Sequence, residues 1–183
     1  MASRAVPAPL AQLPNALTVF RLLLIPVFVA LMIEAGSGKS WPAGIVFGVA
    51  GVTDQLDGYL ARAWHVESRF GQIADPLADR LMIDAAVILL VVYGRLPWAG
   101  LVVILARDLL LLVGWRVLAP RGIDLDVNLI GKGATWLLYT AVGLRIVTHD
   151  HTQWPLWLFW IGLGAAVVAA MFYVRDARKR LAS

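Results

Sequence analysis

Residues 51–79 read GVTDQLDGYLARAWHVESRFGQIADPLAD and join two long apolar segments. This stretch carries four aspartates, Asp54, Asp57, Asp75 and Asp79, where an apolar chain has little reason to place charge without a use for it. If the flanking segments are helices, the i,i+3 spacing of the first two puts them on one face, and the i,i+4 spacing of the last two puts them on another. Two helices that cross at this level would bring the four carboxylates together.

Carboxylates this close repel one another strongly in a low dielectric unless a positive charge lies between them. Aspartate oxygens are hard ligands suited to Mg²⁺, Mn²⁺ or Ca²⁺. The acidic stretch therefore predicts a divalent metal site. The alternative is a structural cluster in which arginines neutralise the acids.

The residues between the two acid pairs fit a phosphate ligand. Gly58 and Ala61 continue the face of the first pair and leave a strip with almost no side chain, where a ligand can approach the backbone. Arg62 follows, with a planar cationic fork that matches phosphate oxygens. Together with a metal, these residues indicate a site for a nucleotide diphosphate.

The composition of the whole chain indicates an integral membrane protein. Of its 183 residues, 60% are hydrophobic, and the mean hydropathy is +0.76, whereas soluble domains are about 45–50% apolar. A hydrocarbon core of ~30 Å needs roughly 20 helical residues. We expect a single all-α domain over residues 1–183, with residues 1–13 as a flexible or interfacial lead. The six predicted transmembrane helices cover residues 15–34, 41–63, 73–93, 97–118, 129–147 and 155–174.

The basic residues predict the orientation of these spans. With a cytoplasmic N-terminus, twelve of the sixteen arginines and lysines lie at inner ends, three lie at outer ends, and Arg107 lies within a span. Both termini and the acid cluster are therefore expected on the cytoplasmic side. The basic residues accompany no nucleic-acid recognition motif, so anionic lipid headgroups are the expected partner. The absence of cysteine excludes disulfides and thiolate metal sites.

The spacing of the acidic stretch resembles the signature of the CDP-alcohol phosphotransferase family. The matching pattern is Asp54-x-x-Asp57-Gly58-x-x-Ala61-Arg62, then eight residues, then Gly71-x-x-x-Asp75-x-x-x-Asp79. The resemblance implies Mg²⁺ or Mn²⁺ held by the four aspartates, with Asp79 as the general base. It also implies nucleotide contacts at Gly58, Ala61, Arg62 and Gly71, and a homodimer as the common state.

The opening segment PNALTVFRLLLIP (residues 14–26) resembles the start of the glycerol-acceptor branches of this family. The resemblance makes Asn15 and Thr18 candidate nucleotide contacts, with Arg21 beside them. A helix cap at Asn15 and an interfacial anchor at Arg21 explain these residues equally well.

Three basic residues are candidate contacts for the acceptor: Arg69, Arg107 and Lys132. Arg107-Asp108 lies within a span, either as an ion pair that holds helices together or at the wall of a polar cavity. Asp84, also within a span, is expected to pair with Arg107 or another buried cation rather than to join the acid cluster. The GKGAT segment places Thr135 near Lys132.

By this resemblance, the chain transfers a phosphatidyl group from CDP-diacylglycerol to a glycerol-type hydroxyl and releases CMP. Arg107-Asp108 resembles the Arg-Asp of cardiolipin synthases, and the Lys132 segment lacks the second Lys and the Gln usual in phosphatidylglycerophosphate synthases. These features favour phosphatidylglycerol as acceptor, with glycerol 3-phosphate as the alternative. A divalent-cation transporter is a hypothesis from another class, but Arg62 among the acids would repel a cation.

Overall fold

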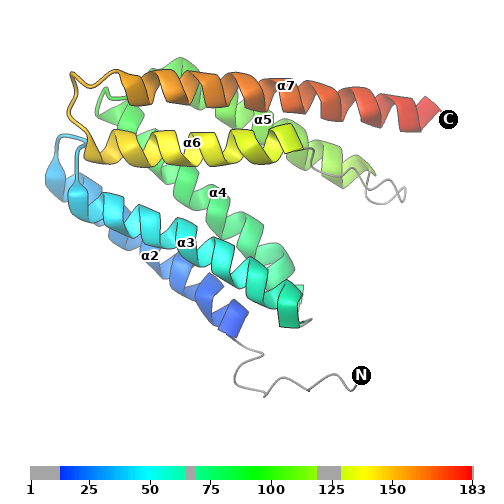
Figure 1. Ribbon diagram of the computed structural model, residues 1–183, viewed down its shortest axis with the longest axis horizontal. Helices are drawn as coiled ribbons and strands as arrows, with labels where there is room; N and C mark the ends of the chain where they lie inside the picture. The colour runs from blue at the N-terminus through cyan, green and yellow to red at the C-terminus, as the bar shows by residue number, and fades with distance from the viewer. Residues whose placement is uncertain (1–12, 65–68, 119–128, 183) are drawn as a thin grey trace. The chain divides into compact units, whose positions relative to one another are not determined.

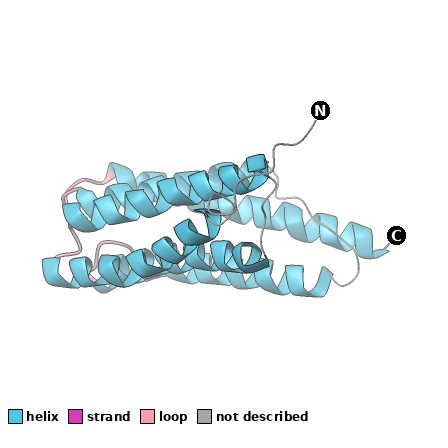
Figure 2. Ribbon diagram, turned by 90° about the horizontal axis from the view of Figure 1, so that it is seen from below, coloured by secondary structure: helices cyan, strands magenta, loops and turns pink. Residues whose placement is uncertain are grey.

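The computed structural model describes residues 13–64, 69–118 and 129–182. In these residues all regular structure is helical, which confirms the all-α prediction (Figures 1 and 2). The helices are α2 (Leu13–Ala35), α3 (Trp41–Trp64), α4 (Arg69–Val92), α5 (Trp98–Leu118), α6 (Leu129–Val147) and α7 (Trp154–Ala182).

Two helices extend beyond their predicted spans. Helix α7 continues to Ala182, past the predicted span 155–174, which agrees with the apolar span Trp154–Arg175. The segment that follows, RDARKRLA, stays helical because it is rich in strong helix formers. Helix α4 begins at Arg69 rather than near residue 73, so Pro76 lies inside it and not in its first turn. A helix can contain such a proline where neighbouring groups satisfy the freed carbonyl.

Within the described residues, two helices are long and apolar enough to cross a membrane. These spans are Asn15–Ala35 in α2 and Trp154–Arg175 in α7. Large apolar side chains are also exposed along the other helices, among them Ile45, Val92 and Leu109, each at least 62% exposed. Exposed apolar surface of this extent is typical of a protein that faces lipid.

The chain forms two compact units, residues 1–89 and 90–183. In the first unit, α2 and α3 are antiparallel neighbours (Figure 1). Gly36 and Gly38 make the turn between them at φ values of 63° and 69°, which favour glycine. Phe28 and Phe47 pack across the helix pair with ring centroids 5.9 Å apart.

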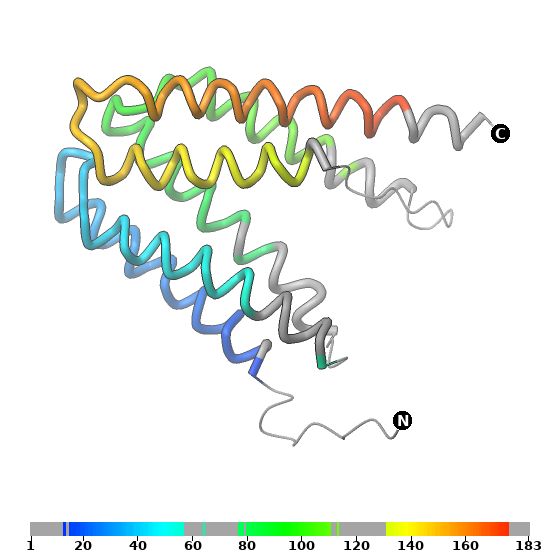
Figure 3. The backbone as a smooth tube through the Cα atoms, in the orientation of Figure 1, coloured from blue at the N-terminus to red at the C-terminus, as the bar shows by residue number. Residues whose placement is uncertain are grey.

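In the second unit, α7 packs against both α5 and α6, and its course along α6 is clear in Figure 3. Glycines allow the close approach at both contacts. A Cβ on Gly162 would lie 3.2 Å from Leu138 of α6, and a Cβ on Gly100 of α5 would lie 2.6 Å from the ring of Phe159. A Cβ on Gly164 would meet nothing within 4 Å. The small residues of α7 therefore serve at least one contact within the chain.

Two buried arginines close the second unit at the end where α4 leads into α5 and α6 leads into α7. Arg95 donates to the carbonyl oxygen of Thr148 at 2.6 Å, and its Nε lies 2.8 Å from Asp150 Oδ1. Arg145 donates to the carbonyl oxygens of Arg95 at 2.9 Å and Thr152 at 2.8 Å. We call these five residues the arginine clasp, because they join the 93–97 turn to the 148–153 loop.

Candidate functional site

The two acid pairs lie on the helices that their spacing predicted. Helix α3 runs through Asp54 and Asp57, and α4 runs through Asp75 and Asp79, so each pair shares a helix face. Of the four carboxylates, the described side chains include that of Asp54. The predictions that fall outside the described side chains concern Asp57, Gly58, Ala61, Arg62, Arg69, Gly71, Asp75 and Asp79.

Asp54 makes an ion pair across the interface between α3 and α2. Its Oδ1 lies 2.8 Å from NH1 of Arg21, and the two side chains are 26% and 1% exposed, respectively. The arginine is therefore out of water, while the carboxylate still reaches solvent. A buried guanidinium needs such a partner because the cost of removing its charge from water is several kcal/mol.

The helix face that carries Arg21 explains why it is buried. Thr18, Arg21, Phe28 and Met32 are all buried on α2 and recur at helical spacing. Phe28 and Met32 form an apolar seam along this face, and Thr18 and Arg21 extend the buried seam toward the N-terminal end of the helix. On α3, the matching buried residues are Ala43, Phe47 and Ala50, and Asp54 follows them at i+4.

This seam corrects two of the sequence-based interpretations. Arg21 is not an interfacial anchor whose head reaches water, because it is 1% exposed and faces Asp54. Asn15 is the third residue of α2, which begins at Leu13, so it does not occupy the position of an N-cap. Arg21 lies beside Asp54, an acid of the signature, and the nucleotide contacts expected at Asn15 and Thr18 stay predictions.

The environment of Asp54 is compatible with a metal ligand. A carboxylate offers about four lone-pair sites. One oxygen lies 2.8 Å from Arg21, the other lies 3.5 Å from Nε2 of Gln55, and the side chain is 26% exposed. Hydrogen-bonded partners of this kind orient carboxylates that bind metals. The alternative hypothesis was that arginines neutralise the acids. Asp54 does pair with an arginine, Arg21.

Arg107 and Asp108 form an ion pair between neighbours on α5, with NH1 2.9 Å from Oδ1. The side chains are 18% and 16% exposed. Because both residues belong to one helix, this pair does not tie two helices together as one interpretation expected. Arg107 does line a cavity, as the other interpretation expected, but the cavity walls are mainly apolar rather than polar. The pairing expected of Asp84 with Arg107 or another buried cation stays a prediction.

The two α6 candidates differ in their surroundings. Lys132 is exposed in the first turns of α6, where its ammonium can reach a soluble anion. The Thr135 hydroxyl donates to the carbonyl oxygen of Gly131 at 3.0 Å within its own helix. The acceptor contacts expected at Lys132 and Thr135 stay predictions, and of the two side chains Lys132 is the exposed one.

The comparison with family models matches residues 11–172 to the CDP-alcohol phosphatidyltransferase model. This range includes both acid pairs and the α2 seam that holds Arg21.

Curated relatives carry consistent names. A Bacillus subtilis protein named CDP-diacylglycerol–glycerol-3-phosphate 3-phosphatidyltransferase is 36% identical over 168 residues, covering 80% of this chain and 86% of the relative. An Escherichia coli K12 protein of the same name is 30% identical over 165 residues, covering 79% and 91%. A Mycobacterium tuberculosis protein named probable phosphatidylglycerophosphate synthase is 36% identical over 143 residues, covering 76% and 68%.

Proposed function

The chain belongs to the CDP-alcohol phosphatidyltransferase family, and we propose that it transfers a phosphatidyl group from CDP-diacylglycerol to glycerol 3-phosphate with release of CMP. The observation that carries this proposal is the family match over residues 11–172, which contains every position of the acidic signature. Membership of this family makes the protein a membrane-embedded transferase of phospholipid synthesis. This argues against the hypothesis that it is a cation transporter.

The choice of acceptor departs from the expectation of phosphatidylglycerol. The relatives compared are named for glycerol 3-phosphate or for phosphatidylglycerophosphate. Two features favoured phosphatidylglycerol: the Lys132 segment, which lacks the second Lys and the Gln, and Arg107-Asp108 in place of Arg-Glu. These two acids differ by one methylene, and either can pair with a neighbouring arginine, so the difference carries little information about the acceptor.

In the proposed reaction, the acceptor hydroxyl oxygen attacks the phosphatidyl phosphorus. The bond from this phosphorus to the bridging oxygen breaks, and CMP leaves with that oxygen. Asp79 takes the hydroxyl proton, which requires its carboxylate within about 3 Å of the acceptor oxygen. Most of the rate enhancement in such a transfer comes from positioning and charge stabilisation.

Asp54, Asp57, Asp75 and Asp79 are the residues that would hold Mg²⁺ or Mn²⁺. A divalent ion there supplies charge neutralisation at the diphosphate and a better leaving group. Arg21 is a positioning residue in this scheme, because its contact at 2.8 Å fixes the Asp54 carboxylate.

The remaining residues bind the two substrates. Gly58, Ala61 and Gly71 give the nucleotide access to the backbone, and Arg62 pairs with its phosphates, with Asn15 and Thr18 nearby on α2. The acceptor phosphate is assigned to three cations: Arg69, Arg107 and Lys132.

We further propose a multi-pass arrangement in the inner membrane with the active site on the cytoplasmic side. The distribution of basic residues supports this orientation, and soluble nucleotide leaves on that side. A homodimer is the expected assembly, as in the family.

The test uses purified full-length protein in nanodiscs with Mn²⁺ and CDP-diacylglycerol. Glycerol 3-phosphate and phosphatidylglycerol are offered separately, CMP release is measured, and lipid products are identified by mass spectrometry. We expect phosphatidylglycerophosphate from the first acceptor and loss of CMP release in Asp79→Asn. Cardiolipin from the second acceptor alone would overturn the proposed acceptor, and CMP release undiminished in Asp79→Asn would overturn the proposed base.

A further inference from the structure

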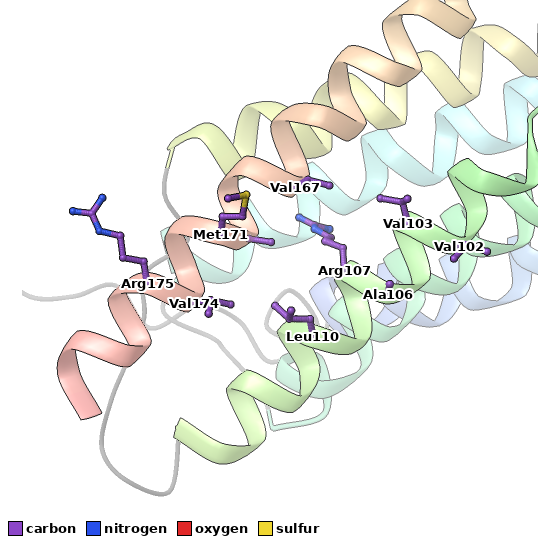
Figure 4. Close-up of a pocket in the computed structure, with 10 residues that line it drawn as sticks. Val102, Val103, Ala106, Arg107, Leu110, Val167, Met171, Val174 and Arg175 are labelled. Atoms are coloured by element: carbon purple, nitrogen blue, oxygen red, sulfur yellow. The ribbon is translucent and has the colours of Figure 1, made fainter. Parts of the chain in front are cut away.

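A groove of about 700 Å³ lies between α5 and α7, within the second unit (Figure 4). Eight of the ten residues that line it are apolar, and the other two are arginines. The lining residues are Val102, Val103, Ala106, Arg107 and Leu110 of α5, and Val167, Ala170, Met171, Val174 and Arg175 of α7.

The groove has the length and the apolar walls expected of a site for a lipid chain. On each helix its lining spans eight residue steps, from Val102 to Leu110 and from Val167 to Arg175, which is ~12 Å at 1.5 Å per residue. Half of a hydrocarbon core of ~30 Å is about 15 Å. With α7 spanning the membrane, a groove of this length would extend through most of one leaflet.

The two arginines place positive charge in this apolar setting. Arg107 points its guanidinium toward α7 (Figure 4), and its buried Nε makes no hydrogen bond among the described residues, although NH1 contacts Asp108. Arg175 is exposed and ends the apolar span Trp154–Arg175. A residue at the end of a span lies at the level of lipid phosphates.

We propose that this groove binds one anionic phospholipid of the surrounding membrane. An acyl chain lies along the valines and Met171, and the phosphate meets Arg175 with further attraction from Arg107. A soluble anion would gain nothing from the apolar walls. A zwitterionic lipid would bring its ammonium group toward two cations, so net negative charge is favoured. The site shares Arg107 with the acceptor contacts proposed above, but lipid binding along the apolar walls and at Arg175 requires neither donor nor acceptor.

The charge of the site is tested at Arg175, because Arg107 is also a candidate acceptor contact. Full-length protein is equilibrated in mixed micelles with equal amounts of phosphatidylglycerol and phosphatidylcholine of matched chains, and retained lipid is measured by native mass spectrometry. A basic residue near anionic lipid contributes about 1 kcal/mol, so Arg175→Gln is expected to reduce the preference for phosphatidylglycerol about fivefold. Arg175→Lys should keep most of it. Equal retention of the two lipids by the wild type would overturn the proposal.

The groove itself is tested with a matched pair of variants on α7. Val167 lines the groove and is 36% exposed, whereas Val168 is 44% exposed and is absent from the lining. Val167→Trp should fill the groove and abolish retention of the anionic lipid, and Val168→Trp should leave it unchanged. Size-exclusion chromatography and circular dichroism check that both variants fold.

Two outcomes would overturn the lipid assignment. One is equal retention of phosphatidylglycerol by Val167→Trp and Val168→Trp. The other is a change from dimer to monomer in Val167→Trp alone, with lipid retention intact, which would make the groove an interface between copies of the chain. Ala170→Phe provides a second groove-filling variant if Val167→Trp does not fold.

Discussion

Arg21 on α2 and Asp54 on α3 form an ion pair at 2.8 Å in which the cation is fully buried and the acid is about one-quarter exposed. The pair therefore links Arg21, a buried cation that needs a charged partner, to Asp54, a proposed metal ligand of the active site. Arg21 needs the carboxylate because it has left water, whereas Asp54 can be hydrated or can bind a metal.

This asymmetry predicts unequal costs of the two single substitutions. Asp54→Asn leaves a buried guanidinium without its carboxylate and should lower the free energy of unfolding by about 2–4 kcal/mol. Arg21→Met should cost less, about 1–2 kcal/mol, because the exposed acid can turn to solvent. Unfolding in detergent, followed by circular dichroism, measures both values. Equal costs would show that Asp54 is as buried as Arg21.

A double variant separates the structural role of Asp54 from its catalytic one. Arg21→Met with Asp54→Leu removes both charges, so most of the stability lost in Asp54→Asn should return. CMP release should stay absent, because a proposed metal ligand is gone. Recovery of activity together with stability would show that Asp54 serves the fold alone.

The helices were predictable from the sequence because each contains an apolar segment bounded by polar or turn residues, although among the described residues two of them, α2 and α7, are apolar enough over a membrane length. The ends of α4 and α7 were not, since the chain continues as helix through residues that are polar. Arg69 and Ala182 lie outside the apolar runs, and polarity alone does not end a helix. Hydropathy marks the apolar part of a helix, whereas the helix itself ends where backbone and capping preferences change.

The family was predictable because the spacing of the signature acids is specific, but the partner of Asp54 was not. Arg21 stands 33 residues before Asp54, and no local spacing connects the two. A usable signal was the presence of an arginine inside an apolar run, which requires an acidic or carbonyl partner. The same signal applied to Arg145 in α6, which donates to the carbonyl oxygen of Arg95, 50 residues away in the sequence.

The arginine clasp should contribute strongly to stability. Arg145 donates to the carbonyl oxygens of Arg95 and Thr152, and loss of a charged donor costs about 1.5–3 kcal/mol per bond. We expect Arg145→Met to lower the free energy of unfolding by about 2–4 kcal/mol. Arg145→Lys keeps the charge but cannot reach both carbonyls, so it should cost about half as much. The free energy of unfolding is measured in detergent. Equal values for both variants and the wild type would contradict this assignment.

Two glycines of the second unit predict opposite effects of the same substitution. Gly100→Ala would place a Cβ 2.6 Å from the ring of Phe159, which is itself 1% exposed and cannot easily move. Such overpacking costs about 1–3 kcal/mol. Gly164→Ala meets nothing within 4 Å and should stabilise α7 by up to about 1 kcal/mol. Thermal unfolding of the two variants in one detergent compares them directly, and a destabilised Gly164→Ala would reveal a partner on that face.

The proposed metal site predicts distinct kinetic changes for two of the acids. Asp57→Asn weakens a ligand, so the Mn²⁺ concentration for half-maximal CMP release should rise about tenfold or more. Asp79→Asn removes the proposed base and should lower kcat by about 10²–10⁴ even at saturating Mn²⁺. Titration of Mn²⁺ into protein stripped with EDTA measures both effects. Full activity in EDTA would refute the metal site.

The acceptor assignment predicts a contrast between neighbours on α6. If Lys132 binds the phosphate of glycerol 3-phosphate, Lys132→Gln removes a charge-assisted hydrogen bond worth about 1.5–3 kcal/mol, so KM should rise about 10- to 100-fold. The Thr135 hydroxyl is bonded to the carbonyl oxygen of Gly131, so Thr135→Val should change KM less than about twofold. CMP release at varied acceptor concentration gives both values. A larger effect at Thr135 than at Lys132 would move the acceptor contact to the hydroxyl and reverse the assignment.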